Sequence, residues 1–137
     1  MNKSINDLDV CIIGLGTIGK RYVRVFCENL NPRSLAVYDI DETKSIESAS
    51  QHGIKMYNQT ETMLEKENPD IVIVATPDSD HERPVKLALE SNANVFNIRS
   101  TMKNIKVNSI IGRIDATITW VFFSFKACFL AEEVTVS

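Results

Sequence analysis

Short runs of apolar, β-branched residues alternate along this chain with segments of helical periodicity. Residues 10–13 form a continuous apolar run that Gly14 ends, and from Ile18 onwards apolar residues recur at helical spacing. Strands that alternate with helices predict right-handed crossovers and a parallel sheet covered on both faces. We therefore expect an α/β fold, a doubly wound, Rossmann-like sheet of order 3-2-1-4-5. Its strands are expected near residues 9–14, 34–40, 54–57, 70–76 and 93–98.

Capping residues mark where the predicted helices begin and end. Asp41 or Thr43 is placed to cap a polar helix, and Gly53 follows that helix as a C′ glycine. Ser79 and Glu82 have capping-box spacing ahead of a later amphipathic segment. These boundaries keep each helix between two strands, as a doubly wound fold requires.

Three glycines with Gly-x-Gly-x-x-Gly spacing follow the first predicted strand and open the first helix. The spacing alone has many chance matches, but inside a βαβ unit each glycine has a function. Gly14 permits a tight turn, Gly16 lets the backbone approach a pyrophosphate, and Gly19 lets the helix pack closely on the sheet. The N–H groups of the first helical turn, around Thr17 and Ile18, would point at the anion. The turn is therefore predicted to bind the phosphates of a dinucleotide.

Asp39 ends the second predicted strand, 20 residues after Gly19. A carboxylate at that position can accept hydrogen bonds from both ribose hydroxyls of NAD, and it repels the 2′-phosphate of NADP. The predicted cofactor is therefore NAD rather than NADP. The alternative role for Asp39 is a cap or turn residue ahead of the next helix, a role for which Asp41 competes.

Composition narrows the class of protein. A chain of 137 residues with 44% hydrophobic residues is long enough for one domain with a core. The net charge of −3 gives no electrostatic footprint for nucleic acid or an anionic membrane. The first ten residues lack an apolar or Arg-rich targeting segment, so a cytoplasmic protein is expected. The three cysteines fit no metal-ligand spacing, which predicts free thiols and no metal site.

The last forty or so residues break the alternation of strands and helices. Residues 1–96 carry 10 basic and 15 acidic groups, whereas residues 97–137 carry 5 and 3. The apolar run 118–130 contains Lys126 and is too short for a convincing membrane span. We interpret it as a further buried strand or an interface patch. Self-association is expected through its aromatic residues, Trp120, Phe122, Phe123, Phe125 and Phe129.

Three stretches resemble one family of enzymes. "VCIIGLGTIGKRYVRVF", "LAVYDIDETK" and "PDIVIVATPDSDHERPVKLALESNANVF" are similar to the NAD(P)-binding domain of the Gfo/Idh/MocA oxidoreductases over about residues 8–96. These enzymes act mainly on sugars, inositols and related polyols, and they include biliverdin reductase-like members. The resemblance implies a dinucleotide-binding Rossmann domain over residues 1–98, and an atypical tail over residues 99–137.

The ATP-D-x-x-H loop is the most specific part of this resemblance. In the family, that loop lies against the ribose and nicotinamide of the cofactor. By analogy Ala75, Thr76, Pro77 and His81 line the cofactor site. The alternative for His81 is a solvent-facing position in the first turn of the following helix.

The family's Glu-Lys-Pro motif is replaced here by Asn97-Ile98-Arg99-Ser100. In the family, the lysine of that motif helps to move the hydroxyl proton, whereas a guanidinium stays protonated and cannot relay one. We interpret Arg99 as a solvated charge at a strand end, and we predict no catalytic residue in this chain.

The family's substrate domain is also missing, so the chain is expected to be incomplete for catalysis. It is either a genuinely shortened protein or, as the abrupt tail favours, the product of a frame or gene-boundary artefact. The hypotheses are the cofactor half of an oxidoreductase that transfers hydride to or from a polyol-like carbon, and a stand-alone NAD-binding or sensing module without enzymatic activity. A Rossmann-like domain that has lost its nucleotide is a third hypothesis, against which the glycines and Asp39 count.

Overall fold

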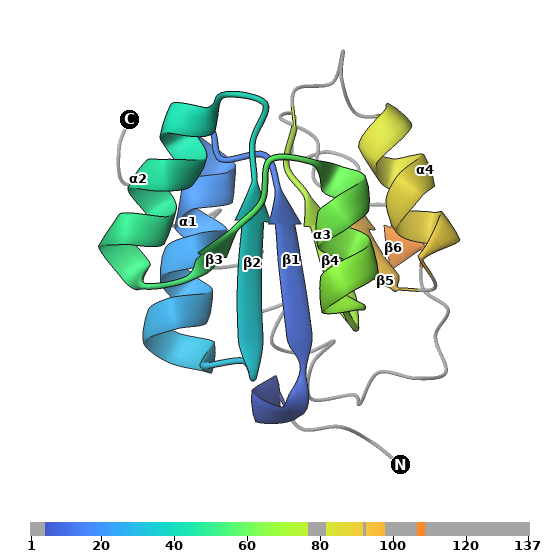
Figure 1. Ribbon diagram of the computed structural model, residues 1–137. Helices are drawn as coiled ribbons and strands as arrows, with labels where there is room; N and C mark the ends of the chain where they lie inside the picture. The colour runs from blue at the N-terminus through green and yellow to red at the C-terminus, as the bar shows by residue number, and fades with distance from the viewer. Residues whose placement is uncertain (1–4, 77–81, 92, 98–106, 109–137) are drawn as a thin grey trace, which may run out of the picture.

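The computed structural model describes residues 5–76, 82–91, 93–97 and 107–108, which form a single sheet with helices around it (Figure 1). The sheet order is β3-β2-β1-β4-β5-β6, and the first five strands in this order run parallel. The predicted order 3-2-1-4-5 is therefore confirmed. The strands are β1 (Asp9–Ile13), β2 (Ser34–Tyr38), β3 (Lys55–Met56), β4 (Ile71–Val74), β5 (Asn94–Asn97) and β6 (Val107–Asn108).

The sixth strand was not predicted. β6 pairs antiparallel with β5, with Phe96 opposite Val107, and it extends the sheet beyond the fifth parallel strand. It lies in residues 99–137, the predicted atypical tail. Two residues of that tail therefore belong to the same sheet as the preceding domain.

Helices connect the parallel strands. The α-helices are α1 (Thr17–Val25), α2 (Glu42–His52), α3 (Thr60–Glu67) and α4 (Glu82–Glu90). A short 3₁₀-helix, η1 (Ile5–Asp7), precedes β1, and α1 continues as a π-helix, η2 (Phe26–Leu30), which Asn31 ends in the left-handed conformation. Two helices lie on each side of the sheet, since α1 packs beside α2 and α3 packs beside α4 (Figure 1).

The core has two parts, one on each face of the sheet. Alternate residues of β1 point to opposite faces: Val10 and Ile12 join the cluster around α1, whereas Cys11 and Ile13 join the cluster under α3 and α4. All four residues of β4 are buried. Strands buried on both faces read as continuous apolar runs, which is why β1 and β4 could be recognised from the sequence.

The caps of α2 agree with the prediction and remove one ambiguity. Asp41, not Thr43, is the N-cap, and its Oδ1 accepts the N–H of Thr43 at 3.1 Å. Gly53 ends the helix with a φ of 65° and donates its N–H to the Ala49 carbonyl at 2.9 Å. Ser79, the predicted cap of α4, lies outside the described residues.

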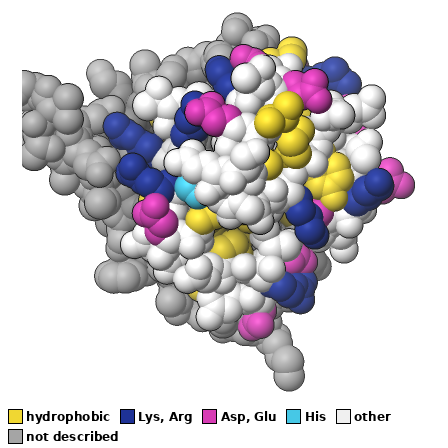
Figure 2. All heavy atoms as spheres, turned by 60° about the vertical axis from the view of Figure 1, so that its left-hand side comes forward, with side chains coloured by type: hydrophobic (Ala, Val, Ile, Leu, Met, Phe, Trp, Pro, Cys, Tyr) yellow, Lys and Arg dark blue, Asp and Glu magenta, His cyan; other side chains and the backbone are white. Residues whose placement is uncertain are grey.

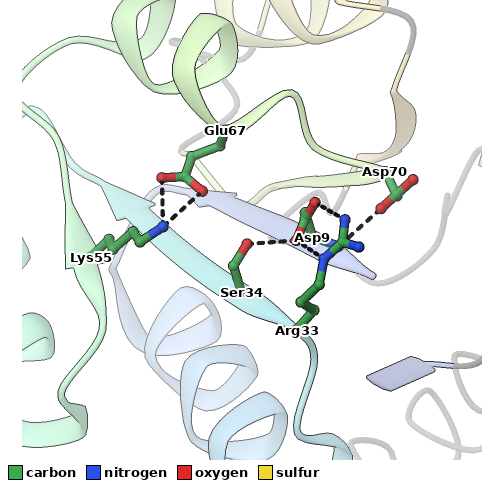
Figure 3. A network of polar contacts seen from close by, with 6 residues as sticks. All are labelled: Asp9, Arg33, Ser34, Lys55, Glu67 and Asp70. Atoms are coloured by element: carbon green, nitrogen blue, oxygen red, sulfur yellow. Dashed lines mark hydrogen bonds and ion pairs between the residues drawn. The ribbon is translucent and has the colours of Figure 1, made fainter. Parts of the chain in front are cut away.

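A polar network joins the strands at the amino edge of the sheet (Figure 3). Arg33 forms a bidentate ion pair with Asp9, and Ser34 Oγ donates to the same carboxylate at 2.9 Å. Asp70 Oδ2 accepts the N–H of Asp9 at 2.9 Å, which ties the start of β1 to the residue before β4. These groups hold the starts of three strands together at the edge opposite the one where ligands of open α/β sheets bind.

A second ion pair fastens the end of α3 to β3. Lys55 Nζ lies 3.4 Å from Glu67 Oε1, and the Glu67 side chain is only 7% exposed (Figure 3). Tyr57 donates its hydroxyl to the same Glu67 oxygen at 2.6 Å. Because this nearly buried carboxylate has partners, it is explained by packing and not by a ligand.

Candidate functional site

Three turns meet at the carboxyl edge of the sheet. β1 lies between β2 and β4. The connection after β1 leads to β2 on one side of it, whereas the connection after β4 leads to β5 in the opposite direction along the sheet. Gly14 donates its N–H to the Tyr38 carbonyl, and Ala75 donates to the Ile13 carbonyl, both at 2.8 Å. These bonds hold the turn after β1 against the ends of both neighbouring strands. Ligands of open α/β sheets bind in such a crevice, where the strand order reverses.

Gly14 is required by the fold itself. Its φ of 98° lies in the left-handed region, which favours glycine. A Cβ at this position would lie 2.7 Å from the carbonyl carbon of Ala75 and 2.8 Å from the nitrogen of Thr76. The turn after β1 and the turn after β4 therefore touch, backbone against backbone.

Gly19 is required for a different reason, because α1 passes close over the turn. A Cβ on Gly19 would lie 1.8 Å from the carbonyl oxygen of Gly14. That oxygen is backbone and cannot swing away as the end of a flexible side chain could. The predicted function of this glycine, close packing of the helix, matches the geometry.

Gly16 is the exception among the three glycines. Its φ is −71°, which any residue can adopt, and a Cβ built on it would have no neighbour within 4 Å among the described residues. Gly16 is also the N-cap of α1, and within the described part of the chain no side chain caps that end of the helix. The packing of the described residues gives no reason for a glycine here. The open space in front of a helix N-terminus suits an anionic ligand.

Asp39 stands beside this turn, directly after β2. Its Oδ2 accepts the N–H of Leu15 at 2.7 Å, and its Oδ1 accepts the N–H of Asp41 at 2.8 Å. Each carboxylate oxygen can accept a further hydrogen bond, so these contacts leave capacity for ribose hydroxyls. The two roles weighed for Asp39 are therefore compatible, because the residue serves the turn ahead of α2 and still lies at the candidate site.

Ser45 was missed by the sequence reasoning. It lies on α2, is 1% exposed, and its Oγ accepts the N–H of Asp39 at 2.9 Å. No signal in the sequence marks it, since α2 also carries Ser48 and Ser50. The contact between Leu15 and Asp39 was missed for the same reason, because it joins residues 24 positions apart.

The turn after β4 is described only at its start. Ala75 and Thr76 are half-buried, and their backbone lies against Gly14. Pro77 and His81 lie outside the described residues, and so do Arg99 and the five aromatic residues expected to mediate self-association.

A separate hollow of about 660 Å³ lies beside β3, between α2 and the start of α3. None of the glycine-turn residues lines it, so it is distinct from the candidate site. Figure 2 shows the side of the molecule that carries α2, where basic and acidic side chains are interspersed with apolar ones. The residues that line the hollow are Glu42, Ile46, Met56, Tyr57, Asn58, Gln59 and Thr62.

The described part of the chain shows neither a metal-binding cluster nor a membrane-spanning helix. No group of three His, Cys, Asp or Glu side chains is placed to hold a metal ion there, and Cys11 and Cys27 are free thiols. None of the helices found there is both long enough and apolar enough to span a membrane.

A parallel sheet of this order, with a glycine turn at its switch point and an acid after β2, defines the class of dinucleotide-binding Rossmann domains. Residues 8–97 match the family model described as "Oxidoreductase family, NAD-binding Rossmann fold". This chain belongs to that family, the Gfo/Idh/MocA oxidoreductases, as the resemblance implied.

Two curated proteins and a solved structure are similar to part of this chain. An 85-residue segment, 62% of this chain, is 31% identical to an uncharacterized oxidoreductase of Streptococcus pneumoniae and covers 23% of it. A segment of equal length is 33% identical to 2,7-anhydro-N-acetylneuraminate hydratase of Mediterraneibacter gnavus and covers 22% of it. The fold is shared with scyllo-inositol dehydrogenase from Lactobacillus casei, solved with bound NAD(H) and scyllo-inositol. For that structure the TM-score is 0.60 and the identity 18%, over 66% of this chain and 27% of the dehydrogenase.

Proposed function

We propose that this domain binds NAD at the carboxyl edge of its sheet, with the pyrophosphate at the start of α1 and the adenosine ribose at Asp39. Ala75, Thr76, Pro77 and His81 are proposed to line the other side of the dinucleotide. When bound, the nicotinamide would supply the hydride chemistry of the family, and the residues of this chain would hold and orient the cofactor. The substrate class proposed for the complete enzyme is a sugar or polyol.

The observation that carries this proposal is the open space at Gly16. Gly14 and Gly19 are needed to build the turn, but a Cβ on Gly16 would meet no atom of the described residues within 4 Å, and Gly16 stands at a helix N-terminus that none of their side chains caps. A bound pyrophosphate would explain both features, because it needs close approach to the backbone and accepts hydrogen bonds from the first N–H groups of the helix.

The test is a titration of the whole 137-residue protein with NADH, followed by the fluorescence of the nicotinamide. The wild-type protein should show saturable binding, and Gly16→Val should weaken it by about 10-fold or more, since a side chain would occupy the place of the phosphates. Gly53→Ala is the matched control, because Gly53 has a φ of 65° and lies at the far end of α2.

The two substitutions separate binding from stability. Gly16→Val should lower the free energy of unfolding by about 1 kcal/mol at most, since valine is a poorer N-cap than glycine. Gly53→Ala should lower it by about 1–2 kcal/mol and leave NADH affinity unchanged, because alanine is strained in the left-handed region. Absence of NADH binding by the wild-type protein would refute the proposal, and unchanged binding by Gly16→Val would refute the assignment of the phosphate site.

A stand-alone dinucleotide-binding module is the second candidate function. The observation in its favour is that the match to the family model ends at residue 97, before the position where the family's lysine is replaced by Arg99. Such a module would bind NADH with the same residues and would catalyse no turnover.

A further inference from the structure

Three hydrogen bonds meet at Asp39 and link it to two segments besides its own turn. The carboxylate accepts the N–H groups of Leu15 and Asp41, at 2.7 and 2.8 Å. The backbone N–H of Asp39 is donated to Ser45 Oγ at 2.9 Å. The position of the glycine turn, reached through Leu15, therefore depends on how the backbone is held at Asp39.

Ser45 is placed to hold that backbone. On the side of β2 that faces β3, the pairing ends where Tyr57 donates its N–H to the Val37 carbonyl, so the next N–H on that side, that of Asp39, needs another acceptor. Ser45 lies in the first half of α2 and is 1% exposed, so water cannot readily replace its hydroxyl. A buried N–H that loses its acceptor is costly, and the turn would shift in order to satisfy it.

We propose that Ser45 is a positioning residue for dinucleotide binding. Its buried hydroxyl fixes the backbone at Asp39, and the carboxylate can then both hold the N–H of Leu15 and face the adenosine ribose. This inference rests on the proposed function, since it concerns the same site. Ser45 acts through Asp39 and does not itself touch the ligand.

The effect of losing the hydroxyl follows from preorganisation. With Ser45 in place, the Asp39 carboxylate is already oriented before the ligand binds, so binding loses little conformational entropy at this turn. Without it, the turn after β2 relaxes, and restoring the arrangement on binding reduces affinity. The loss should be confined to the ligand contacts that Asp39 makes.

The experiment compares Ser45→Ala with Ser48→Ala in the full chain. Ser48 lies on the same helix, is 4% exposed, and forms no hydrogen bond with Asp39 in the described structure, so it is a matched control for removing a buried hydroxyl from α2. NADH titrations should show affinity about 3- to 10-fold weaker for Ser45→Ala, and within about twofold of wild type for Ser48→Ala.

A second ligand distinguishes positioning from general destabilisation. The probe is the NADH analogue whose adenosine ribose lacks the 2′-hydroxyl, which removes one hydrogen bond expected at Asp39. If Ser45 acts through Asp39, the loss caused by Ser45→Ala should be clearly smaller with this analogue than with NADH. Equal losses with both ligands, or equal losses for Ser45→Ala and Ser48→Ala, would overturn the inference.

If Ser45→Ala does not fold, Ser45→Cys provides a second test of the inference. Cysteine fills the same buried space, but its sulfur is a weaker hydrogen-bond acceptor. Ser45→Cys should therefore also weaken NADH binding, and it should weaken binding of the analogue clearly less. Wild-type affinity in either folded variant would contradict the inference, and so would the failure of both variants to fold, which would assign Ser45 to folding. Absence of binding by the wild-type protein would refute the proposed function instead.

Discussion

Asp39 combines a structural and a proposed ligand-binding role in a single carboxylate. Its two oxygens accept the N–H groups of Leu15 and Asp41. A residue that only awaited a ribose would not need these partners, and a residue that only capped a turn would not reach Leu15, which is 24 positions away. Substitution of Asp39 should therefore change both the selectivity for the dinucleotide and the overall affinity for it.

The selectivity can be measured by calorimetric titration with NADH and NADPH. The wild-type protein should bind NADH at least about 10-fold more tightly than NADPH. The 2′-phosphate of NADPH is repelled by the Asp39 carboxylate, and it replaces a ribose hydroxyl that could donate a hydrogen bond to that carboxylate. Asp39→Ala should narrow this ratio. It should also weaken NADH binding, since Leu15 loses its acceptor.

Asp41→Ala is the matched control for the selectivity measurement. It removes a carboxylate two residues further on, one that caps α2 by accepting the N–H of Thr43. The ratio of NADH to NADPH affinity should remain at the wild-type value in this variant. Equal affinity for the two dinucleotides in the wild-type protein would show that Asp39 does not face the ribose.

At the scale of elements, the sequence was sufficient to predict those helices, strands and caps that depend on residues close together in the chain. The apolar runs of β1 and β4, the left-handed Gly53 and the N-cap of α2 all depend on neighbouring residues, and the structure confirms them. The order of the strands followed from their alternation with helices. Local rules of this kind are the ones that a single sequence contains.

Contacts between distant segments could not be predicted in the same way. The bond from Ser45 to Asp39 depends on how α2 packs on β2, and the pairing of β6 with β5 joins residues more than ten positions apart. The π-helical end of α1 was also missed, since its apolar residues fit an ordinary helix equally well. The predicted roles of Pro77 and His81 remain predictions, because these residues lie outside the described part.

The face of the sheet under α3 has a consequence for stability at alkaline pH. Cys11 on β1 is fully buried, and burial together with the charges of Glu67 and Asp9 raises the pKa of its thiol from 9.0 to about 12. Burial also raises the pKa of Tyr22, on the opposite face, from 10.0 to about 12. The folded state therefore keeps protons that the unfolded chain releases, so stability is intact below about pH 9 and falls as the pH rises further.

Urea denaturation at about pH 8 and about pH 10.5 measures this effect. For Cys11 alone, the free energy of unfolding should fall by about 2 kcal/mol between the two conditions. Cys11→Ala should be less stable at both pH values because of the cavity it leaves, but its alkaline loss should be smaller by about that amount. An equal loss in wild type and variant would show that the thiol is not the group responsible.

At the scale of the whole molecule, membership of the family and the presence of catalytic residues are separate questions. The match covers residues 8–97, and the segments aligned with the two curated relatives span less than a quarter of either one. One of these relatives is named an oxidoreductase and the other a hydratase. Sharing this domain therefore does not determine the reaction, which depends on the particular groups at each protein's own site.

We accordingly expect this 137-residue chain to bind NAD but not to oxidise a polyol by itself. A positioned proton-transfer group contributes about 10²–10⁴ in rate, and Arg99, which stands near the place of the family's lysine, cannot relay a proton. Substrate positioning can contribute a further 7–11 kcal/mol or so, which a dinucleotide site alone does not supply.

The measurement is NADH absorbance after purified protein is mixed with NAD and a panel of polyols that includes scyllo-inositol. Sustained turnover that disappears in Gly16→Val would show that catalysis needs neither the lysine nor a separate substrate domain, whereas NADH binding without turnover would place the chemistry in groups beyond this domain.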